Sequence, residues 1–392
     1  MPALRVAVDL TTLDQPADRA SAESLQVRFA EALIQHAPGV TFAVLTRPAT
    51  RAALAHLEAS NARQVIIAEP SQLRSVLARF QARLRRRPGV LARLGIDVVF
   101  CPFTSSGVSD SSVPLVVAID DLRHLSHPHL LTSGERTARA QAFGATCRRA
   151  ARIVCSTPSL REVAAQRDGV PAERILTVAP GRLLADHSPT RPAIAATLAR
   201  HGLEEHRFFL FVADFEARHN HRLVLTALAI FRARQPDSEI RLVCVGGPES
   251  AVASFKAIAD QMGLGRYVQF VGGLGREQTS ALMQGCRAVL VPALYETVGE
   301  SVLAALQRGR PVLCSQIPEL TELTGGAALT FDPHRPADLT AAFECVERDP
   351  ALLNRLVQLG RERVATLDDA PAVAEAYLGV FRGAVTTCPP SR

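Results

Sequence analysis

The chain has 392 residues, and its 47% hydrophobic and 21% charged residues are proportions typical of a globular protein. This length allows two ordinary domains, each with its own core. The net charge of +6 is concentrated in the first half, which points to an anionic partner unless it reflects base composition alone. No apolar run reaches the roughly 18 residues of a transmembrane helix, and the N-terminus alternates like a strand rather than a signal peptide.

Eight cysteines are scattered along the chain, and none of them forms a C-x-x-C pair. A zinc site is therefore not expected. Most of the cysteines lie in apolar runs, as Cys244 does, so we expect buried free thiols in a reducing, cytoplasmic environment.

Short apolar runs in the first half predict β-strands that alternate with helical stretches. Runs that are apolar throughout indicate a parallel sheet with both faces covered. The predicted strands are Leu4–Leu10, Thr41–Leu45, Gln64–Ala68, Asp97–Phe100, Leu115–Ile119, Arg152–Cys155 and Ile175–Val178.

Residues 71–87 read as a basic amphipathic helix with one apolar stripe and six arginines, among them Arg85, Arg86 and Arg87. Such a helix suits an anionic membrane surface. The structural alternative is that the stripe packs on the first sheet while the arginines face water. Nucleic acid is not expected as a partner, because the chain has no Trp and three Tyr to stack on bases.

The second half repeats the strand and helix alternation after a polar linker near residues 185–192, which predicts domains over 1–184 and 185–370 and a helical tail over 371–392. In two such doubly wound domains, a ligand is expected in the cleft between them. The predicted strands are Phe208–Val212, Ile240–Val245, Val268–Val271, Ala288–Val291, Pro311–Cys314 and Ala328–Phe331.

Several common catalytic motifs are missing from the sequence. It has no G-x-G-x-x-G after a strand, no P-loop, no H-E-x-x-H and no G-x-S-x-G. Simple dehydrogenases, NTPases, zinc hydrolases and serine hydrolases therefore lose their main support.

A polar, basic loop follows the strand Phe208–Val212 and leads into a predicted helix over Arg222–Ala233. The N–H groups and the dipole at the start of that helix favour a phosphate, and Arg218 adds a bidentate donor. His219 belongs to a residue type that carries a partial positive charge near neutral pH. The structural alternative is a capped helix start with a solvated arginine.

A carboxylate and a glycine occupy the turn after the strand Ala288–Val291. Glu296 is followed by Gly299 and then by a helix that runs through Gln307. A carboxylate accepts hydrogen bonds from sugar hydroxyls, and backbone N–H groups at such a turn suit a phosphate. The turn therefore fits a polyol held beside a phosphate.

This turn resembles the donor-binding half of the family 4 retaining glycosyltransferases. The pattern of that family is a strand, a proline, Glu-x-Phe-Gly-x-x-x-x-Glu, a helix of small residues and Gly-x-Pro-Val, and residues 288–312 are similar to it. The resemblance extends over nearly the whole chain and is strongest from residue 205 to residue 335. Other similar stretches are residues 119–124, 153–157, 268–272, 315–322 and 325–333.

The resemblance implies an α/β, GT-B-like fold, in which two doubly wound Rossmann-like domains face a central cleft and the tail over 371–392 crosses back to the first domain. It implies an enzyme that transfers a sugar, with retention, from a nucleotide-sugar or lipid-phosphate donor. The acceptor would be a hydroxyl of a glycan, a lipid or a protein. No metal and no other cofactor is expected.

The resemblance also implies roles for individual residues. Glu296, Asp120 and Asp121 are the expected catalytic residues, and His124 is expected on the acceptor side. The expected donor-binding residues are Arg218, His219, Val298, Gly299, Glu300, Ser301 and Glu322.

The chain departs from the family pattern at four places. Ala304 stands where the family has its second glutamate, which contacts the donor ribose, and His219 stands in the place of a lysine. Asp120 replaces a histidine, and residues 18–24 replace a glycine-rich loop. Losing a charge-assisted hydrogen bond typically costs about 1.5–3 kcal/mol of binding free energy. Glu300 and Glu322 are candidates to replace the missing acceptor of the ribose or sugar hydroxyls.

Two other interpretations accompany the enzyme. The chain can instead be a catalytically impaired glycosyltransferase-like protein that acts as partner or scaffold of an active transferase. An epimerase or a phosphorylase lacks support, because Lys256 is the single lysine available for a pyridoxal cofactor. We expect the protein in the cytoplasm, with the inner face of the membrane as an alternative location.

Overall fold

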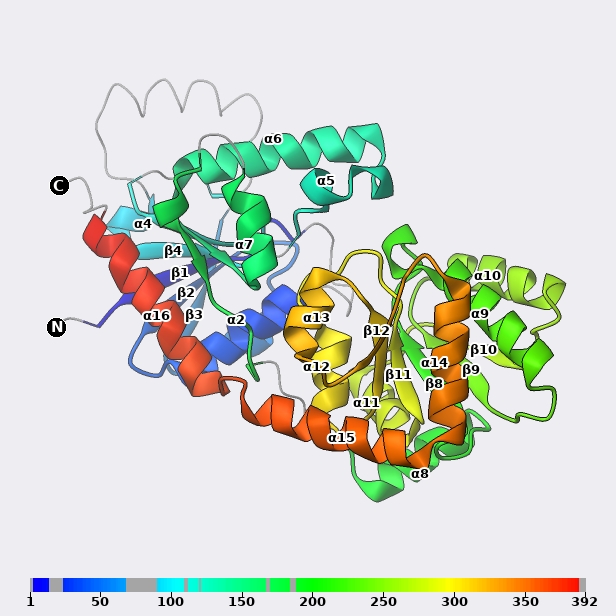
Figure 1. Ribbon diagram of the computed structural model, residues 1–392. Coiled ribbons are helices and arrows are strands. Elements are labelled where there is room, and N and C mark those ends of the chain that lie inside the picture. The colour runs from blue at the N-terminus through cyan, green and yellow to red at the C-terminus, as the bar shows by residue number, and fades with distance from the viewer. Residues whose placement is uncertain are drawn as a thin grey trace. The chain divides into compact units, whose positions relative to one another are not determined.

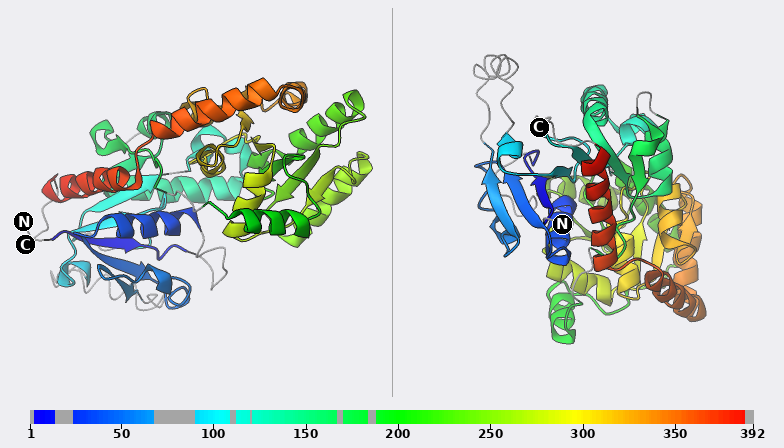
Figure 2. Two further views of the ribbon diagram at one scale, coloured as in Figure 1. Left: turned by 90° about the horizontal axis from the view of Figure 1, so that it is seen from below. Right: turned by 90° about the vertical axis from the view of Figure 1, so that its left-hand side faces the viewer.

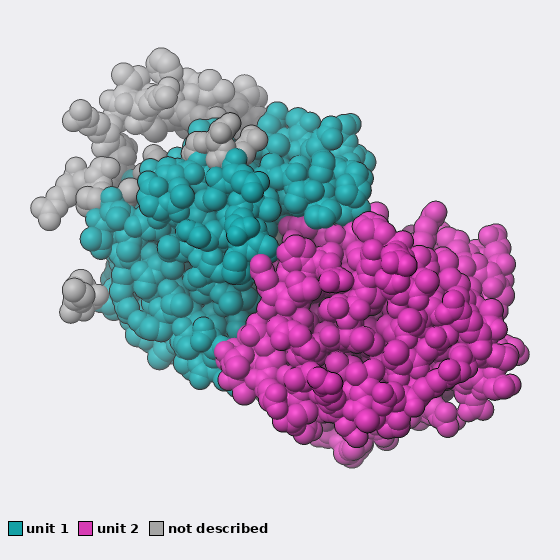
Figure 3. Space-filling view, in the orientation of Figure 1, with its two compact units in different colours: residues 1–184, 368–392 teal, residues 185–367 magenta. Residues whose placement is uncertain are grey.

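The computed structural model (Figure 1 and Figure 2) describes residues 3–13, 24–67, 90–108, 112–119, 121–166, 170–183 and 188–387. Asp120, the basic helix predicted over residues 71–87 and most of residues 18–24 lie outside the described residues. The chain divides into two compact units, Met1–Leu184 with Asp368–Arg392, and Ala185–Leu367, which Figure 3 shows in two colours.

The described residues of the first unit form a seven-stranded parallel sheet with the strand order β3-β2-β1-β4-β5-β6-β7. The central strands are almost entirely buried, as expected for strands whose two faces are both covered. The strands are β1 (Arg5–Asp9), β2 (Thr41–Thr46), β3 (Ala62–Ile66), β4 (Val98–Cys101), β5 (Leu115–Ile119), β6 (Ala150–Cys155) and β7 (Ile175–Thr177).

Helices connect these strands and cover the sheet. One of them, α6, begins with a capping box in which Thr132 and Glu135 each satisfy a backbone N–H of the other. The helices of the first unit are α2 (Leu25–His36), α4 (Val90–Arg93), α5 (Arg123–Ser126), α6 (Ser133–Arg149), α7 (Pro158–Ala165) and α16 (Ala370–Thr387), with short 3₁₀ turns η1 (Ala55–Leu57), η2 (Pro128–Leu130) and η3 (Ala172–Arg174).

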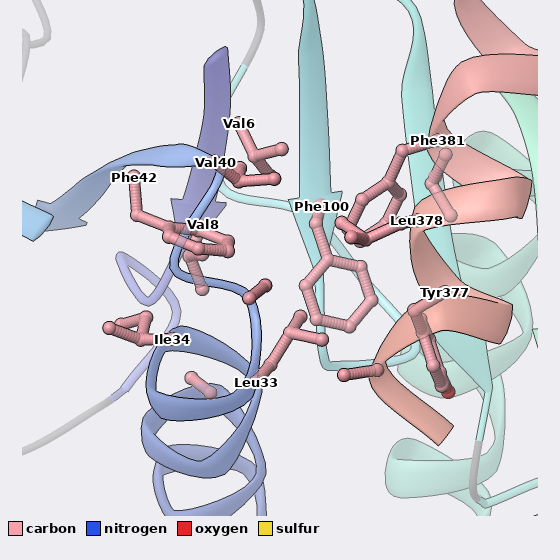
Figure 4. Close-up of a cluster of buried hydrophobic side chains, with 14 of the residues drawn as sticks. Val6, Val8, Leu33, Ile34, Val40, Phe42, Phe100, Tyr377, Leu378 and Phe381 are labelled. Atoms are coloured by element: carbon pink, nitrogen blue, oxygen red, sulfur yellow. The ribbon is translucent and has the colours of Figure 1, made fainter. Parts of the chain in front are cut away.

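The C-terminal helix α16 belongs to the core of the first unit, although the sequence places it after the second unit. It lies beside α2 on one face of the sheet (Figure 2). The ring of Phe100 on β4 lies 5.5 Å from Tyr377 and 5.3 Å from Phe381, both on α16 (Figure 4). The ring of Phe29 of α2 lies 5.0 Å from Tyr377. Aromatic pairs at these distances add to the stabilisation from burial.

The second unit repeats this architecture with a six-stranded parallel sheet in the order β10-β9-β8-β11-β12-β13. Counted within each unit, both sheets therefore begin with the strand order 3-2-1-4-5-6 of doubly wound nucleotide-binding folds. The strands are β8 (Phe208–Val212), β9 (Arg241–Val245), β10 (Val268–Phe270), β11 (Ala288–Val291), β12 (Val312–Ser315) and β13 (Leu329–Phe331).

Two apolar clusters, one on each face of this sheet, form the core of the second unit. Among the described residues, no helix combines the length and the apolar character needed to cross a membrane. The helices of this unit are α8 (Arg191–Arg200), α9 (His221–Arg234), α10 (Glu249–Gln261), α11 (Arg276–Gly285), α12 (Glu300–Gln307), α13 (Pro318–Thr324), α14 (Pro336–Arg348) and α15 (Pro350–Ala365), with the 3₁₀ turn η4 (Ala217–His219).

The predicted α/β class with doubly wound parallel sheets is confirmed. Every predicted strand is present, with ends that differ from the prediction by at most about two residues. The largest difference is at β3, which begins at Ala62 rather than Gln64, because Asn61 already joins the ladder by accepting the N–H of Phe42 at 2.7 Å.

Candidate functional site

Both loops that carry predicted donor-binding residues leave the carboxyl edge of the second sheet at its switch point. In open α/β sheets, ligands bind outside the carboxyl ends of the strands, where the strand order reverses. In the second unit this point lies between β8 and β11. The loop after β8 carries Arg218 and His219, and the loop after β11 carries Glu296.

A backbone hydrogen bond joins these two loops. The N–H of Leu294 donates to the carbonyl of Arg218 at 2.7 Å. The next residue but one, Asn220, adopts the left-handed conformation (φ 59°), and its side-chain amide donates to the carbonyl of Pro333 at 2.8 Å. Loops that follow two other strands therefore hold the turn that carries Arg218 and His219.

Two carboxylates of the same loop pair with the side chains of Arg218 and His219. Arg218 Nε donates to Glu216 at 2.9 Å, and a second guanidinium nitrogen lies 3.9 Å from Asp214. His219 Nε2 lies 3.2 Å from the other oxygen of Asp214. Burial alone raises the pKa of Asp214, but the hydrogen bonds from His219 and from the Glu216 N–H, with the charges of His219 and Arg218, outweigh it and lower that pKa.

His221, the first residue of α9, is buried among aromatic rings. Its ring lies 4.4 Å from Phe211, 4.5 Å from Phe215 and 5.1 Å from Phe255. Burial, aided by the charge of His219 and opposed by that of Asp214, lowers the pKa of His221 to about 4. This imidazole is therefore neutral at pH 7 and adds no positive charge to the loop.

The carboxylate of Glu296 folds back on its own loop, where one oxygen accepts the N–H of Thr297 at 2.9 Å. A second carboxyl group, Glu319 in the first turn of α13, lies close enough to feel this charge. Burial raises the pKa of Glu319, and the negative charges of Glu322 and Glu296 raise it further. The predicted residues Glu296 and Glu322 thus share one acidic region with Glu319, which the sequence analysis did not single out.

Gly299 connects the Glu296 loop to α12. It has φ 69° and caps the helix, and a Cβ built on it would lie 2.3 Å from the side chain of Leu323. The predicted residues Val298, Glu300 and Ser301 surround this point and are partly buried. The positive end of the α12 dipole therefore lies beside the Glu296 loop.

Ala304 lies one turn beyond Glu300 on the same face of α12. Its carbonyl accepts a hydrogen bond from Arg308 at 3.0 Å, and Arg308 also donates to the hydroxyl of Ser280 at 2.8 Å. Burial lowers the pKa of Arg308, and the neighbouring charge of Arg276 lowers it further.

An arginine of α15 fixes the end of α13. Arg363 Nε donates to the carbonyl of Leu323 at 2.8 Å, and a terminal nitrogen donates to the carbonyl of Glu322 at 2.9 Å. These carbonyls lie in the last turn of α13, where they lack intrahelical donors. Arg363 therefore holds the helix that carries the two acidic residues Glu319 and Glu322.

In the first unit, the predicted residue Asp121 is held by two arginines. One oxygen accepts the backbone N–H of Arg123 at 3.0 Å, and the other contacts the side chains of Arg123 at 3.0 Å and Arg139 at 2.8 Å. The side chain of His124 is buried with its ring 5.5 Å from that of Phe143. In this geometry Asp121 organises its loop and His124 packs in the core, so their roles toward a substrate stay predictions.

The switch point of the first unit contains a buried carboxylate that the sequence analysis noted only as part of a strand. Asp9 accepts hydrogen bonds from the hydroxyl and N–H of Thr11 at 2.6 and 3.0 Å. It also accepts from the hydroxyl of Ser106 at 2.6 Å and the N–H of Val108 at 3.3 Å. Asp9 thus joins the loops that follow β1 and β4, and a carboxylate that ends an apolar strand is the signal that identifies it.

The part of the chain that the structure describes contains no group of three or more His, Cys, Asp or Glu side chains placed to hold a metal ion. The predicted donor-binding residues of the second unit instead offer basic, acidic and backbone groups. Such a set suits a ligand that carries both phosphate and hydroxyl groups.

Comparison with known protein families gives a match over most of the second unit. Residues 196–363 match the family model described as glycosyl transferases group 1. Arg218, Glu296, Ala304 and Glu322 all lie within the matched residues. The first unit lies outside this match.

Individual relatives agree with this result. The chain is 25% identical over 316 residues to the alpha-D-kanosaminyltransferase of Streptomyces kanamyceticus, a match that covers 78% of this chain and 80% of that protein. It is 29% identical over 213 residues to a D-inositol 3-phosphate glycosyltransferase of Rhodococcus opacus, which covers 52% of this chain and 47% of that protein.

Among solved structures, HepE of Anabaena, crystallised in complex with UDP and glucose, has a similar fold. The TM-score is 0.72 at 13% sequence identity, and the match covers 97% of this chain and 100% of that chain. At this identity the likeness supports the fold alone.

Proposed function

We propose that the chain, whose residues 196–363 match the glycosyl transferases group 1 family model, transfers a sugar from a nucleotide-sugar donor to an acceptor hydroxyl with retention. The donor would bind to the second unit, at the carboxyl edge between β8 and β11. Retention rests on the resemblance to the family 4 enzymes.

One observation carries this proposal above the others. The hydrogen bond from the N–H of Leu294 to the carbonyl of Arg218, at 2.7 Å, fastens the loop with the cationic side chains to the loop with Glu296. A nucleotide-sugar needs phosphate-binding and hydroxyl-binding groups side by side, and this contact joins the two loops that would supply them at the switch point. The UDP and glucose bound by HepE, which shares the fold, support the same class of donor here.

The side chains of these loops and the helix α12 would supply the chemistry that the reaction needs. Negative charge develops on the leaving phosphate as the glycosidic bond breaks, and preorganised cations and helix dipoles stabilise such charge. Arg218, His219 and the N-terminus of α12 would fill this role, without a metal. Glu296 would accept hydrogen bonds from the sugar hydroxyls, and Asp121 and His124 would belong to the acceptor side.

Ligand binding and product analysis test the proposal. UDP, GDP and TDP are added in turn, and we expect one of them to raise the melting temperature of the protein. Arg218→Gln should abolish that rise, whereas Arg222→Gln, at an exposed arginine of α9, should preserve it. NMR of the product formed from the matching α-linked nucleotide-sugar should show an α-linkage, and a β-linkage would overturn retention.

One feature of the site favours a second candidate function. Ala304 lacks the carboxylate that the family uses on the donor ribose, so we propose as the alternative that the chain is a partner or scaffold of an active transferase. Absence of binding by all three nucleotides, together with no sugar transfer, would support this alternative over the enzyme.

A further inference from the structure

We propose that Asp214 and Glu216 are internal counter-ions, which occupy the phosphate-binding side chains of the free protein and thereby reduce the dependence of donor affinity on phosphate charge. This inference rests on the proposed function of the same site. It makes two residues that the donor need not touch into determinants of donor specificity.

The basic side chains of the loop after β8 form ion pairs with carboxylates of the same loop. Glu216 lies 2.9 Å from Arg218, and Asp214 lies 3.2 Å from His219 and 3.9 Å from Arg218. Each cation therefore already has an anionic partner from its own loop. A phosphate that approaches Arg218 or His219 meets a carboxylate in the position where it would bind.

The charged side chains of this loop balance one another. Two carboxylates stand against one arginine and one histidine, so these four side chains carry no net positive charge. The third basic residue of the segment, His221, is neutral at pH 7 because burial lowers its pKa to about 4. Asp214 keeps its charge far into the acid range, because its hydrogen bonds lower its pKa.

The basic side chains of the loop are less exposed than the carboxylates that pair with them. The side chains of Arg218 and His219 are 17% and 12% exposed, whereas those of Asp214 and Glu216 are 46% and 47% exposed. Bonds to the Leu294 N–H and the Pro333 carbonyl hold the turn of the cations in place. The carboxylates are therefore the partners that can swing into water when a phosphate replaces them.

The energy scale permits this exchange. Ion pairs between partly exposed groups contribute little to stability, so a diphosphate can displace them. A carboxylate that stays close to the bound phosphate repels it in proportion to the phosphate charge, and solvent screening keeps this repulsion moderate. The two acids should thus weaken diphosphate binding strongly, monophosphate binding less, and nucleoside binding not at all.

Isosteric variants test the inference. Asp214→Asn, Glu216→Gln and the double variant keep the size of each side chain, and Asn keeps an oxygen that can accept the Glu216 N–H. Asp237→Asn is the control for net charge, because Asp237 is exposed in the loop at the other end of α9. The affinities for UDP, UMP and uridine are measured by titration calorimetry at low salt.

We expect the double variant to bind UDP about fivefold to thirtyfold more tightly than the wild type, to gain less for UMP, and to bind uridine unchanged. Asp237→Asn should change none of the three affinities. Wild-type binding of UDP with unchanged or weaker binding by the double variant would overturn the inference and leave the proposed function intact. No binding of UDP by any variant would overturn both.

Discussion

Gly299 is the residue at which backbone conformation and packing both restrict the connection between the Glu296 loop and α12. Its φ of 69° is a left-handed conformation that costs other residues about 1–2 kcal/mol, and an added Cβ would lie 2.3 Å from Leu323. Gly299→Ala should therefore lower the free energy of unfolding by about 2 kcal/mol or more, as measured by urea titration.

A second glycine separates these two causes. Gly272 also has φ 69°, but nothing lies within 4 Å of the Cβ that a substitution would add. Gly272→Ala should therefore show the conformational cost alone. Equal losses for the two variants would mean that the side chain of Leu323 moves away without cost.

His221 makes stability depend on pH. Its pKa is about 4 in the folded protein and 6.5 in the unfolded chain, so only the unfolded chain gains its proton as the pH falls through this window. The stability that the neutral imidazole provides is complete above pH 6.5 and is lost progressively toward pH 4. The whole effect amounts to about 3 kcal/mol.

The variant His221→Phe should keep the stacking on Phe211, Phe215 and Phe255 while it removes this titration. We expect its free energy of unfolding to exceed that of the wild type by a margin that grows between pH 6.5 and pH 4. Urea titrations at pH 7.5, 6 and 5 measure that margin. His334→Phe, at an exposed histidine of the same unit, should show no such growth.

Individual residues show where sequence analysis reaches its limit. Arg218 and Glu296 were assigned to one site because both follow apolar strands, and the carboxyl ends of parallel strands share an edge. The pairing of Asp214 with His219 was not predicted, because it depends on side-chain directions inside an irregular loop. The two-arginine environment of Asp121 was missed for a related reason, since Arg139 reaches it from the separate helix α6.

At the scale of elements, α12 carries two positions that bear on the proposed donor site. Glu300 and Ala304 are four residues apart and share a face of the helix, and Arg308, the C-cap residue, donates to the carbonyl of Ala304 at 3.0 Å. Ala304→Glu would place a carboxylate between Glu300 and Arg308. If it accepts hydrogen bonds from the donor ribose, affinity for UDP should rise by about 1–2 kcal/mol.

The sugar of the nucleotide provides the control for this variant. UDP and 2′-deoxy-UDP differ in one ribose hydroxyl that would donate a hydrogen bond to the new carboxylate. The gain in affinity should therefore be smaller for the deoxy form. Titration calorimetry of wild type, Ala304→Glu and Ala304→Leu with both nucleotides measures this difference. A variant that gains nothing with either nucleotide would show that Arg308 draws the carboxylate away or that the ribose lies elsewhere.

Strands and helices were predictable to different degrees. The strands of both sheets stand out in the sequence because buried parallel strands must be apolar along their whole length. The start of α12 was also predictable, since Gly299 separates an irregular loop from a run of good helix formers. The packing of α13 by Arg363 was not, because a side chain that caps the carbonyls of another helix leaves no periodic signal.

At the scale of the whole molecule, the chain returns to its first unit after completing the second. The last helix, α16, contributes Tyr377 and Phe381 to the core of a unit whose other elements all precede residue 185. The first unit is therefore complete only when the end of the chain is present. Its stability should depend on α16, whereas nucleotide binding should depend on the second unit.

Two phenylalanines of equal burial test this division. Phe381 of α16 is fully buried beside Phe100, and Phe343 of α14 is fully buried and stacked 4.6 Å from Phe209 in the second unit. Each change to alanine should cost about 3–5 kcal/mol through lost burial and the cavity left behind. In a calorimetric scan, UDP should raise the midpoint temperature of the unfolding transition of the second unit, because a ligand stabilises the unit that binds it.

Phe381→Ala should lower the midpoint temperature of the transition that UDP does not shift. Phe343→Ala should lower the midpoint temperature of the transition that UDP does shift. The Phe381→Ala protein should keep wild-type affinity for UDP at temperatures where both units are folded. One transition that both variants lower equally would contradict this division, because it would mean that the units unfold as one cooperative body. Two transitions would instead show that the chain crosses between two independently stable cores, with α16 as the C-terminal part of the first.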